Sequence, residues 1–200
     1  MRRIVTIVAL VAAIAGARAA SAQERFWGFK GGVNGGSIVV SGAERFDTRP
    51  DLGGAAGVFA GFSIGPTLRL QPEVAFSARH FTSSDFPLNL RVDARAVEIP
   101  VLLVRRFNVD RRAQPVLLGG PQINIITKTT QTFGSTKSDI TNDFRTADVG
   151  VTFGGGAEIV AGRGALSIEG RVNFGLRDLS ISETTSTRSR NIVALIGYRF

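Results

Sequence analysis

The sequence contains no cysteine and a single histidine, His80. The lack of cysteine excludes disulfide bonds, thiolate metal sites, cysteine nucleophiles and a lipid-modified N-terminal cysteine. With only one histidine, a metal centre built from several histidines is impossible. Any catalytic arrangement of a serine, a histidine and an acid would have to use His80. We therefore predict no metal site and no cofactor.

Beyond residue 22 the sequence also lacks a long hydrophobic segment. The densest apolar run covers residues 99–104 and includes Pro100, whereas a helix that spans a bilayer needs roughly 20 apolar residues. Glycine, which occurs 24 times, interrupts nearly every stretch that could form an apolar helix. Membrane-spanning helices are therefore not predicted in this part of the chain.

The N-terminus has the pattern of a secretory signal peptide. Residues 1–3 include two arginines, residues 4–16 are apolar except for Thr6, and residues 20–22 have the small-x-small pattern that signal peptidase recognises. We predict cleavage after Ala22, so that residues 1–22 direct export and residues 23–200 form one domain. The alternative is an uncleaved N-terminal anchor.

The chain is basic, with 24 Lys and Arg residues against 16 Asp and Glu residues and a formal net charge of +8. Three of the basic residues lie in the predicted signal peptide, and its removal lowers the net charge to +5. The other basic residues are scattered and are not interleaved with aromatic residues, as they would be on a surface that binds nucleic acid. We therefore predict no nucleic-acid partner.

Apolar and polar residues alternate along the exported part of the chain, which is typical of β-strands with one apolar face. In residues 166–177, the clearest case, one face carries Leu166, Ile168, Gly170, Val172, Phe174 and Leu176. The other face carries Ser167, Glu169, Arg171, Asn173, Gly175 and Arg177. Eight such segments predict strands at residues 26–36, 53–64, 67–80, 90–105, 114–127, 146–160, 165–178 and 190–200.

Segment 90–105 is irregular because its apolar residues change phase. Leu90 and Val92 occupy even positions, whereas Val97 and Ile99 occupy odd positions. An extra residue in one strand of a pair would produce this change. We therefore predict a β-bulge near residues 95–97.

The connections between the predicted strands alternate in length. Short turns rich in Gly, Pro, Asn and Asp are predicted at residues 65–66, 108–113 and 161–164. Long polar loops are predicted at residues 37–52, 81–89, 128–145 and 179–189. This alternation is typical of an antiparallel meander in a membrane, and with eight strands both ends of the meander lie on the side of the short turns.

These features predict an all-β fold, an eight-stranded antiparallel up-and-down transmembrane β-barrel. A tilted strand needs ~9–11 residues to span a bilayer, and the predicted apolar faces are about this long. Backbone groups in lipid must be paired internally, so the strands must close into a barrel. The alternative is a soluble periplasmic barrel, whose apolar face would point inward.

In the transmembrane barrel the charged residues of the polar face point into the interior. An eight-stranded barrel has an interior that side chains fill, and buried charges there must be matched by opposite charges. We predict a structural ion network in the lumen that consists of Lys30, Arg69, Glu73, Glu98, Glu158, Glu169 and Arg171.

The sequence ends in Phe200, and a second aromatic residue, Tyr198, lies on the same face. This ending resembles the C-terminal signature of bacterial outer-membrane proteins, which the barrel-assembly machinery recognises. The resemblance implies that Tyr198 and Phe200 form the assembly signal. We also expect an aromatic girdle near the periplasmic ends of the first and last strands, formed by Trp27, Phe29, Tyr198 and Phe200.

Internal motifs are similar to those of a known family. They are FKGGVN at residues 29–34, VEIPVLL at 97–103, GGP at 119–121 and DVG at 148–150. In this order they resemble the small outer-membrane β-barrel domain family, the PorT-type or porin-family proteins with an OmpA-like transmembrane barrel architecture. The likeness covers nearly all of residues 23–200 and implies a location in the outer membrane of a Gram-negative-type bacterium.

Catalytic and metal-binding interpretations of the sequence are weak. Lipid A deacylases of this architecture use a His and a Ser two residues apart on one strand. Here Ser77 is three residues before His80, on the opposite face, Thr82 is a poor substitute for a serine, and Asp85 is the only acid nearby in the sequence. Glu158 and Glu169 are better explained as lumen charges than as an acid/base pair.

Two further patterns have simple structural explanations. Glycines 154–156 lack the Lys-Ser/Thr of a phosphate-binding loop and are predicted inside a strand. Asp139, Asn142 and Asp143 do not have the spacing of an EF-hand loop.

We predict an integral outer-membrane protein, not an enzyme, with a structural or surface-interaction role carried by its long loops. Its predicted partners are membrane lipids, the barrel-assembly machinery and an unidentified partner of the extracellular loops. A narrow porin-like channel for small solutes is the main alternative, and a lipid A-modifying enzyme is the other.

Overall fold

The computed structural model describes residues 25–41, 49–83, 90–133, 136–139, 147–176 and 186–200. The predicted signal peptide lies outside the described residues. Within these ranges, the structure contains no helix long and apolar enough to cross a membrane.

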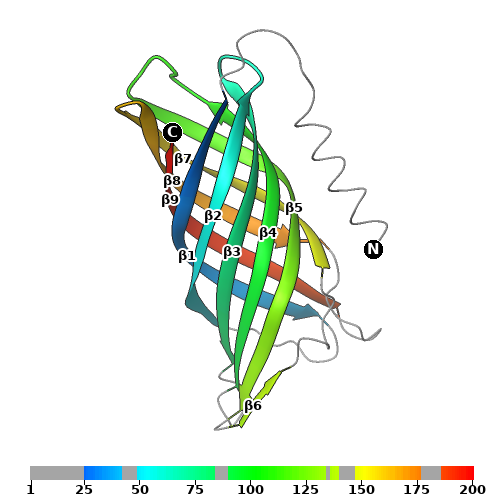
Figure 1. The fold of residues 1–200 in the computed structure, drawn as a ribbon. Helices are drawn as coiled ribbons and strands as arrows, with labels where there is room; N and C mark the ends of the chain where they lie inside the picture. The colour runs from blue at the N-terminus through cyan, green and yellow to red at the C-terminus, as the bar shows by residue number, and fades with distance from the viewer. Residues whose placement is uncertain (1–24, 42–48, 84–89, 134–135, 140–146, 177–185) are drawn as a thin grey trace.

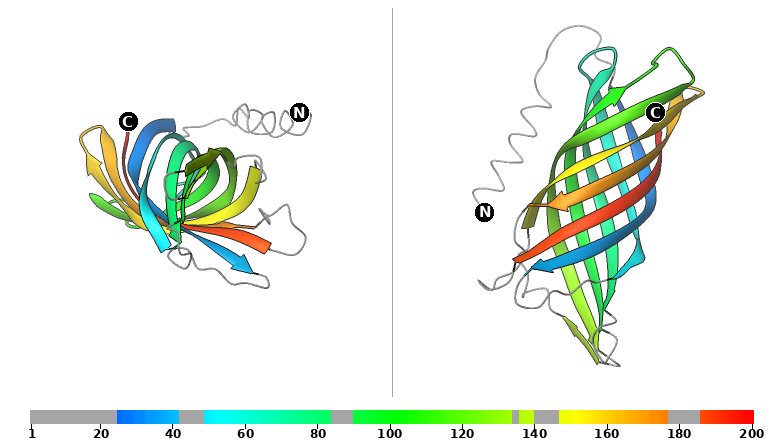
Figure 2. Two further views of the ribbon diagram at one scale, coloured as in Figure 1. Left: turned by 90° about the horizontal axis from the view of Figure 1, so that it is seen from below. Right: turned by 180° about the vertical axis from the view of Figure 1, so that it is seen from behind.

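The described residues form an antiparallel sheet that closes on itself (Figures 1 and 2). Its strands are β1 (Arg25–Ser41), β2 (Arg49–Ser63), β3 (Leu68–Ser83), β4 (Leu90–Arg106), β5 (Ala113–Phe133), β6 (Thr136–Asp139), β7 (Ala147–Ala161), β8 (Gly164–Gly175) and β9 (Ser186–Arg199). Each strand except β6 pairs with a neighbour on both sides, and β9 pairs with β1 to close the barrel. The predicted eight-stranded antiparallel up-and-down barrel is confirmed.

The short strand β6 is an addition that the sequence did not reveal. It pairs only with the end of β5, from Thr130 with Asp139 to Phe133 with Thr136. In Figure 1 it extends beyond the barrel at the end opposite the C-terminus. All four residues of β6 are polar and exposed, so they give no hydrophobic pattern. For this reason the sequence predicts a loop here.

The short turns and the first and last barrel strands, β1 and β9, are arranged as predicted. Residues 64–67, 107–112 and 162–163 connect strands at one end of the barrel, which we call the base. The beginning of β1 and the end of β9 also lie at the base, where the Phe200 amide donates to the Trp27 carbonyl oxygen at 2.9 Å. At the opposite end, the rim, β1, β3 and β5 extend 3 to 6 residues beyond their predicted ends.

The β-bulge is at the predicted level but in a different strand. The register shifts between Arg95 and Ala96, where Arg95 pairs with Lys128 and Ala96 with Ile126. The extra residue is therefore Thr127 in β5, and β4 keeps one phase throughout. The phase change in the sequence arises because the outward positions of β4 become charged toward the rim, as at Asp93.

The outer surface of the barrel is apolar and its interior is largely polar. Large apolar side chains that are at least one-third exposed lie on all eight barrel strands, among them Trp27, Val58, Val74, Phe76, Leu103, Leu117, Phe153, Ile168 and Ile196. The residues that alternate with them are buried and include charged side chains. A polypeptide with this polarity is suited to a lipid environment.

Inward-facing glycines allow the strong curvature of so small a barrel. A Cβ atom on Gly32 would lie 1.9 Å from the Ala194 carbonyl oxygen of β9, and one on Gly156 would lie 1.9 Å from the Ile168 carbonyl oxygen of β8. These contacts involve backbone atoms, which cannot move aside. Glycine is therefore required where adjacent strands approach closely.

Candidate functional site

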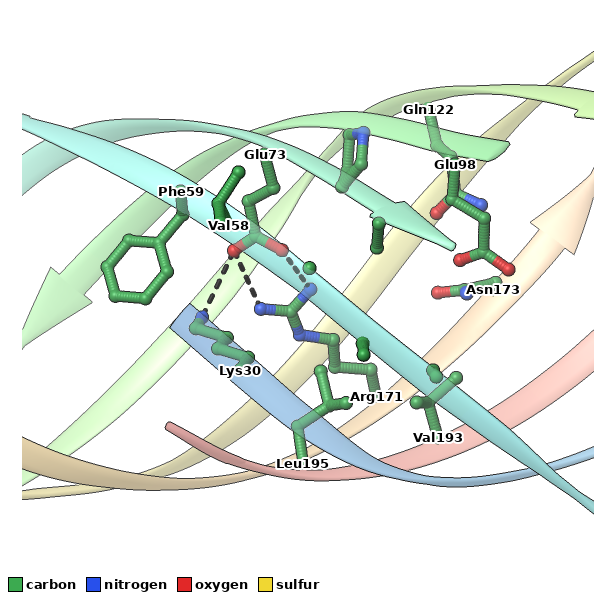
Figure 3. A pocket seen from close by; sticks show the side chains of 15 residues that line it. Lys30, Val58, Phe59, Glu73, Glu98, Gln122, Arg171, Asn173, Val193 and Leu195 are labelled. Carbon is green, nitrogen blue, oxygen red and sulfur yellow. Dashed lines mark hydrogen bonds and ion pairs between the residues drawn. The ribbon is translucent and has the colours of Figure 1, made fainter. Parts of the chain in front are cut away.

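The centre of the lumen contains a four-residue ion cluster, which we call the central cluster; Figure 3 shows three of its members, Lys30, Glu73 and Arg171. It consists of Lys30 on β1, Glu73 on β3, and Glu169 and Arg171 on β8. The Lys30 ammonium lies 3.0 Å from Glu73 Oε1 and 2.7 Å from Glu169 Oε1. The Arg171 guanidinium donates to both Glu73 oxygens, at 2.7 and 2.8 Å, and to Glu169 Oε2 at 2.5 Å.

This cluster matches its charges within the barrel. Two cations face two carboxylates, and every member is at least 94% buried. Gln71 donates a further hydrogen bond to Glu73 at 2.6 Å. Because β3 and β8 lie on opposite sides of the closed sheet, the Arg171–Glu73 pair crosses the lumen, and Lys30 on β1 connects both carboxylates.

A second ion pair lies closer to the base. Arg69 on β3 binds the carboxylate of Glu158 on β7 through both terminal nitrogens, with Nη1 at 2.9 Å from Oε2. Arg199 Nε lies 3.7 Å from the same oxygen. The guanidinium groups of Arg69 and Arg199 lie 5.1 and 5.0 Å from the ring centre of Phe26, so the aromatic ring contributes to matching the charge.

The third ion pair joins Arg79 on β3 to Glu98 on the adjacent strand β4. All seven residues predicted for the lumen network therefore point inward and are buried. The sequence indicated their face but not their partners, because the partners depend on register and barrel diameter. Of the three groups, only Arg79 and Glu98 come from neighbouring strands.

The lumen also contains an apolar tier that was not predicted. Leu102 and Val104 on β4 pack with Val116 and Leu118 on β5, and each is at most 5% exposed. These residues lie near the base, at the turn between β4 and β5. Their signal in the sequence was hidden because residues 99–104 are apolar on both faces of the strand.

A polar tier lies between the central cluster and the rim. The Asn34 amide donates to Ser77 Oγ at 3.0 Å, and the Thr152 hydroxyl donates to Asn173 Oδ1 at 3.0 Å. Between this tier and the central cluster is a cavity of about 30 Å³ (Figure 3). This volume is about enough for one water molecule. The interior is thus filled at several levels.

His80 lies on the outward face of β3, near the rim. Its Nδ1 lies 2.5 Å from Asp93 Oδ1 on β4, and Arg91 Nε donates to the same oxygen at 3.1 Å. The sequence did not suggest Asp93, although the register of the β3–β4 hairpin pairs the two residues. The expected acid, Asp85, lies outside the described residues.

Ser77 is on the lumen side of the barrel, as the odd spacing from His80 predicted. It is fully buried, and its hydroxyl accepts hydrogen bonds from Asn34 and, at 3.4 Å, from Arg79 Nε. The wall of the barrel therefore separates this hydroxyl from the imidazole. Glu158 and Glu169 are bound by different cations, as described above.

Other candidates from the sequence have structural roles or remain untested. Gly154 and its two following glycines lie inside β7, as predicted. No group of three potential metal ligands occurs among the residues that the structure describes. Asp139 is the last residue of β6, and Asn142 and Asp143 lie outside the described ranges.

Aromatic residues gather at the base, where β1 and β9 meet. The rings of Trp27 and Phe200 stack with their centres 4.4 Å apart, and Tyr198 contacts Phe200 edge-on at 4.9 Å. Phe29 lies 6.5 Å from Tyr198 and 6.0 Å from Phe200. All four residues proposed for the girdle are thus in one aromatic group at the seam.

Comparisons with known proteins agree with this architecture. A family profile described as "Outer membrane protein beta-barrel domain" matches residues 20–180. The comparison with curated proteins gives no match.

Several solved structures are similar in fold. Ail, the attachment invasion locus protein of Yersinia pestis, has 12% identity and a TM-score of 0.50, with 88% of this chain and 99% of Ail covered. Neisserial surface protein A has 15% identity and a TM-score of 0.44, with coverage of 86% and 95%. The outer membrane enzyme PagL has 9% identity and a TM-score of 0.44, with coverage of 82% and 97%.

Proposed function

Since the chain belongs to the outer membrane protein beta-barrel domain family, we propose that it is a closed, non-conducting barrel whose role is structural or surface-interactive. In this proposal the barrel anchors the polar connections of its rim, which meet an extracellular partner. The barrel family places the protein in the outer membrane, and export by the N-terminal signal peptide is part of the proposal.

The filled lumen is the observation that carries this proposal. The apolar tier, the two inner ion-pair groups and the polar tier together fill the interior between base and rim. An ion that crossed the barrel would have to separate Lys30 and Arg171 from Glu73 and Glu169. Breaking buried ion pairs leaves uncompensated charge and is strongly unfavourable.

Conductance of the purified, refolded protein in planar lipid bilayers tests this proposal. We expect no discrete current steps above those of a protein-free membrane. Reproducible steps would overturn the closed barrel and support the narrow channel for small solutes. A variant with Leu102→Gly and Leu118→Gly, which removes part of the apolar tier, keeps the central cluster and serves to show which tier blocks the pore.

The proposed orientation places the base in the periplasm and the rim outside the cell. The aromatic seam at the base and the polar composition of the rim connections support this orientation. Trypsin added to intact cells is expected to cleave after the exposed Lys137 of β6 and to spare Arg163 in the turn between β7 and β8. Cleavage at Arg163 without cleavage at Lys137 would reverse the orientation.

We also propose that the protein is not an enzyme. His80 faces outward with Asp93 as its partner, whereas Ser77 faces the lumen. Mass spectrometry of lipid A from cells with the protein and cells with the His80→Ala variant should give the same profile. A change in acyl chains that depends on His80 would instead support a lipid A-modifying enzyme.

A further inference from the structure

Polar and charged side chains replace apolar ones at the same level on three adjacent strands. The outward face of β3 carries Val74, Phe76 and Ala78 and then His80, and that of β4 carries Val97 and then Arg95. On β5 the corresponding change occurs after the bulge, at Lys128. The outer surface therefore has a charged edge directly above an apolar wall.

The register brings cations together at this edge. Arg95 pairs with Lys128 across β4 and β5, and both side chains are exposed on the outward face. Like charges opposite each other on one face of a sheet are destabilising. Lys137 on β6, which pairs with Thr132 of β5, adds a third cation.

The carboxylates that the structure describes in this region have partners of their own. The register places Asp51 opposite His80 and Asp139 opposite Thr130, and each has an interaction partner. Asp93 binds His80 at 2.5 Å and Arg91 at 3.1 Å. Within the described part of the chain, Arg95, Lys128 and Lys137 form no ion pair with an acid. These three residues, with His80 and Asp93, line a surface pocket of about 260 Å³, which we call the rim pocket.

The rim pocket lies at the height of lipid headgroups. From Leu68, the first outward apolar residue of β3, twelve residues lead to His80. At ~3.4 Å per residue and a tilt of about 40°, this distance corresponds to about 30 Å along the membrane normal, the thickness of the hydrocarbon core of a typical bilayer. The pocket therefore opens where the hydrocarbon region ends.

We propose that the rim pocket binds the phosphate group of an outer-leaflet lipid. Guanidinium and ammonium groups are the usual protein partners of phosphate, and three of them without an acidic partner among the residues that the structure describes match a multiply charged anion. Phe76 and Val97 below the pocket provide apolar surface for the acyl chains of the same molecule. This inference rests on the orientation given under the proposed function.

Native mass spectrometry of the detergent-solubilised protein tests the proposal. The probes are phosphatidic acid, which has a phosphate monoester, diacylglycerol, which has the same acyl chains without phosphate, and inorganic phosphate. We expect phosphatidic acid to bind at least about tenfold more tightly than either of the other two. Equal binding of diacylglycerol, or equally tight binding of inorganic phosphate, would contradict a lipid phosphate site.

Paired variants separate the pocket from general basicity. The double variant Arg95→Gln/Lys128→Gln should weaken phosphatidic acid binding by about tenfold, whereas Arg105→Gln/Arg163→Gln, which removes two exposed arginines at the base, should change it by less than about twofold. Equal losses in the two variants would overturn the site. Heat-modifiable gel migration checks that both variants are folded.

The lipid measurement is independent of the conductance test. A barrel that conducts ions but loses phosphatidic acid only in Arg95→Gln/Lys128→Gln would contradict the closed barrel and support the rim pocket. A barrel that conducts no ions and binds phosphatidic acid no more tightly than diacylglycerol would support the closed barrel and contradict the rim pocket.

Discussion

At the scale of single residues, the strict alternation of faces determines most of what the sequence reveals. Glu169 and Arg171 are two residues apart on β8, so they share a face, and both are buried in the lumen. Their partners Lys30 and Glu73 could not be predicted, since they come from distant strands. Which charges meet across a lumen depends on closure and strand stagger, and neither is visible in a single segment.

Loss of one cation from the central cluster should be costly. Lys30→Met leaves two buried carboxylates with Arg171 as their remaining cationic partner, and breaking a buried pair costs about 3–5 kcal/mol. We expect a decrease of this size in the free energy of unfolding, measured by urea denaturation in lipid vesicles with the fluorescence of Trp27. Lys137→Met on the exposed β6 is the control and should change it by less than about 0.5 kcal/mol. A similar decrease in both variants would argue against the cluster as a stabilising element.

The neighbouring leucines of β4 provide a second test at this scale. Leu102 is fully buried in the apolar tier, whereas Leu103 is 46% exposed on the outer surface. Leu102→Ala leaves a cavity and should cost about 2–5 kcal/mol in the same urea assay. Lipid chains can fill the space left by Leu103→Ala, which should therefore cost distinctly less. Equal costs would mean that Leu102 is not packed inside the barrel.

At the scale of strands, the existence and order of the eight barrel strands were predictable because apolar and polar residues alternate in each, although the alternation in residues 90–105 is irregular. The ends were less predictable. β5 runs on to Phe133 through polar residues, which form backbone pairs beyond the apolar wall without any hydrophobic pattern. The bulge at Thr127 shows the same difficulty, since the pattern gave its level and not the strand that holds the extra residue.

The seam between β1 and β9 should depend on the last residue. Phe200 stacks on Trp27, and its amide bonds to the Trp27 carbonyl oxygen. We expect Phe200→Ala to lower the fraction of folded protein in the outer membrane several-fold, measured by heat-modifiable migration on gels. Phe153→Ala removes a similarly exposed ring, 55% against 51%, away from the seam, and should leave assembly nearly unchanged. If both variants assemble equally well, Phe200 has no special role in closure or recognition.

At the scale of the whole molecule, the barrel follows from one physical requirement, the pairing of every backbone group in lipid. Alternation, the short turns and the lack of apolar helices were enough to predict closure. The division of the lumen into an apolar tier, ion pairs and a polar tier was not predictable, because Leu102 and Val104 read as part of an apolar run. Asp93 and the rim pocket were missed because they depend on register across three strands.

The orientation of the two faces is the central claim, and the lack of cysteine allows a direct test by single spin labels. A label at Ile168, on the outward face of β8, should be accessible to oxygen dissolved in lipid and protected from a water-soluble nickel reagent. A label at Lys137 on β6 should show the reverse, and both sites are exposed on the isolated barrel. The account predicts this contrast in reconstituted bilayers. If the label at Ile168 were as accessible to the nickel reagent as the label at Lys137, the apolar face would be in water and the transmembrane barrel would be contradicted.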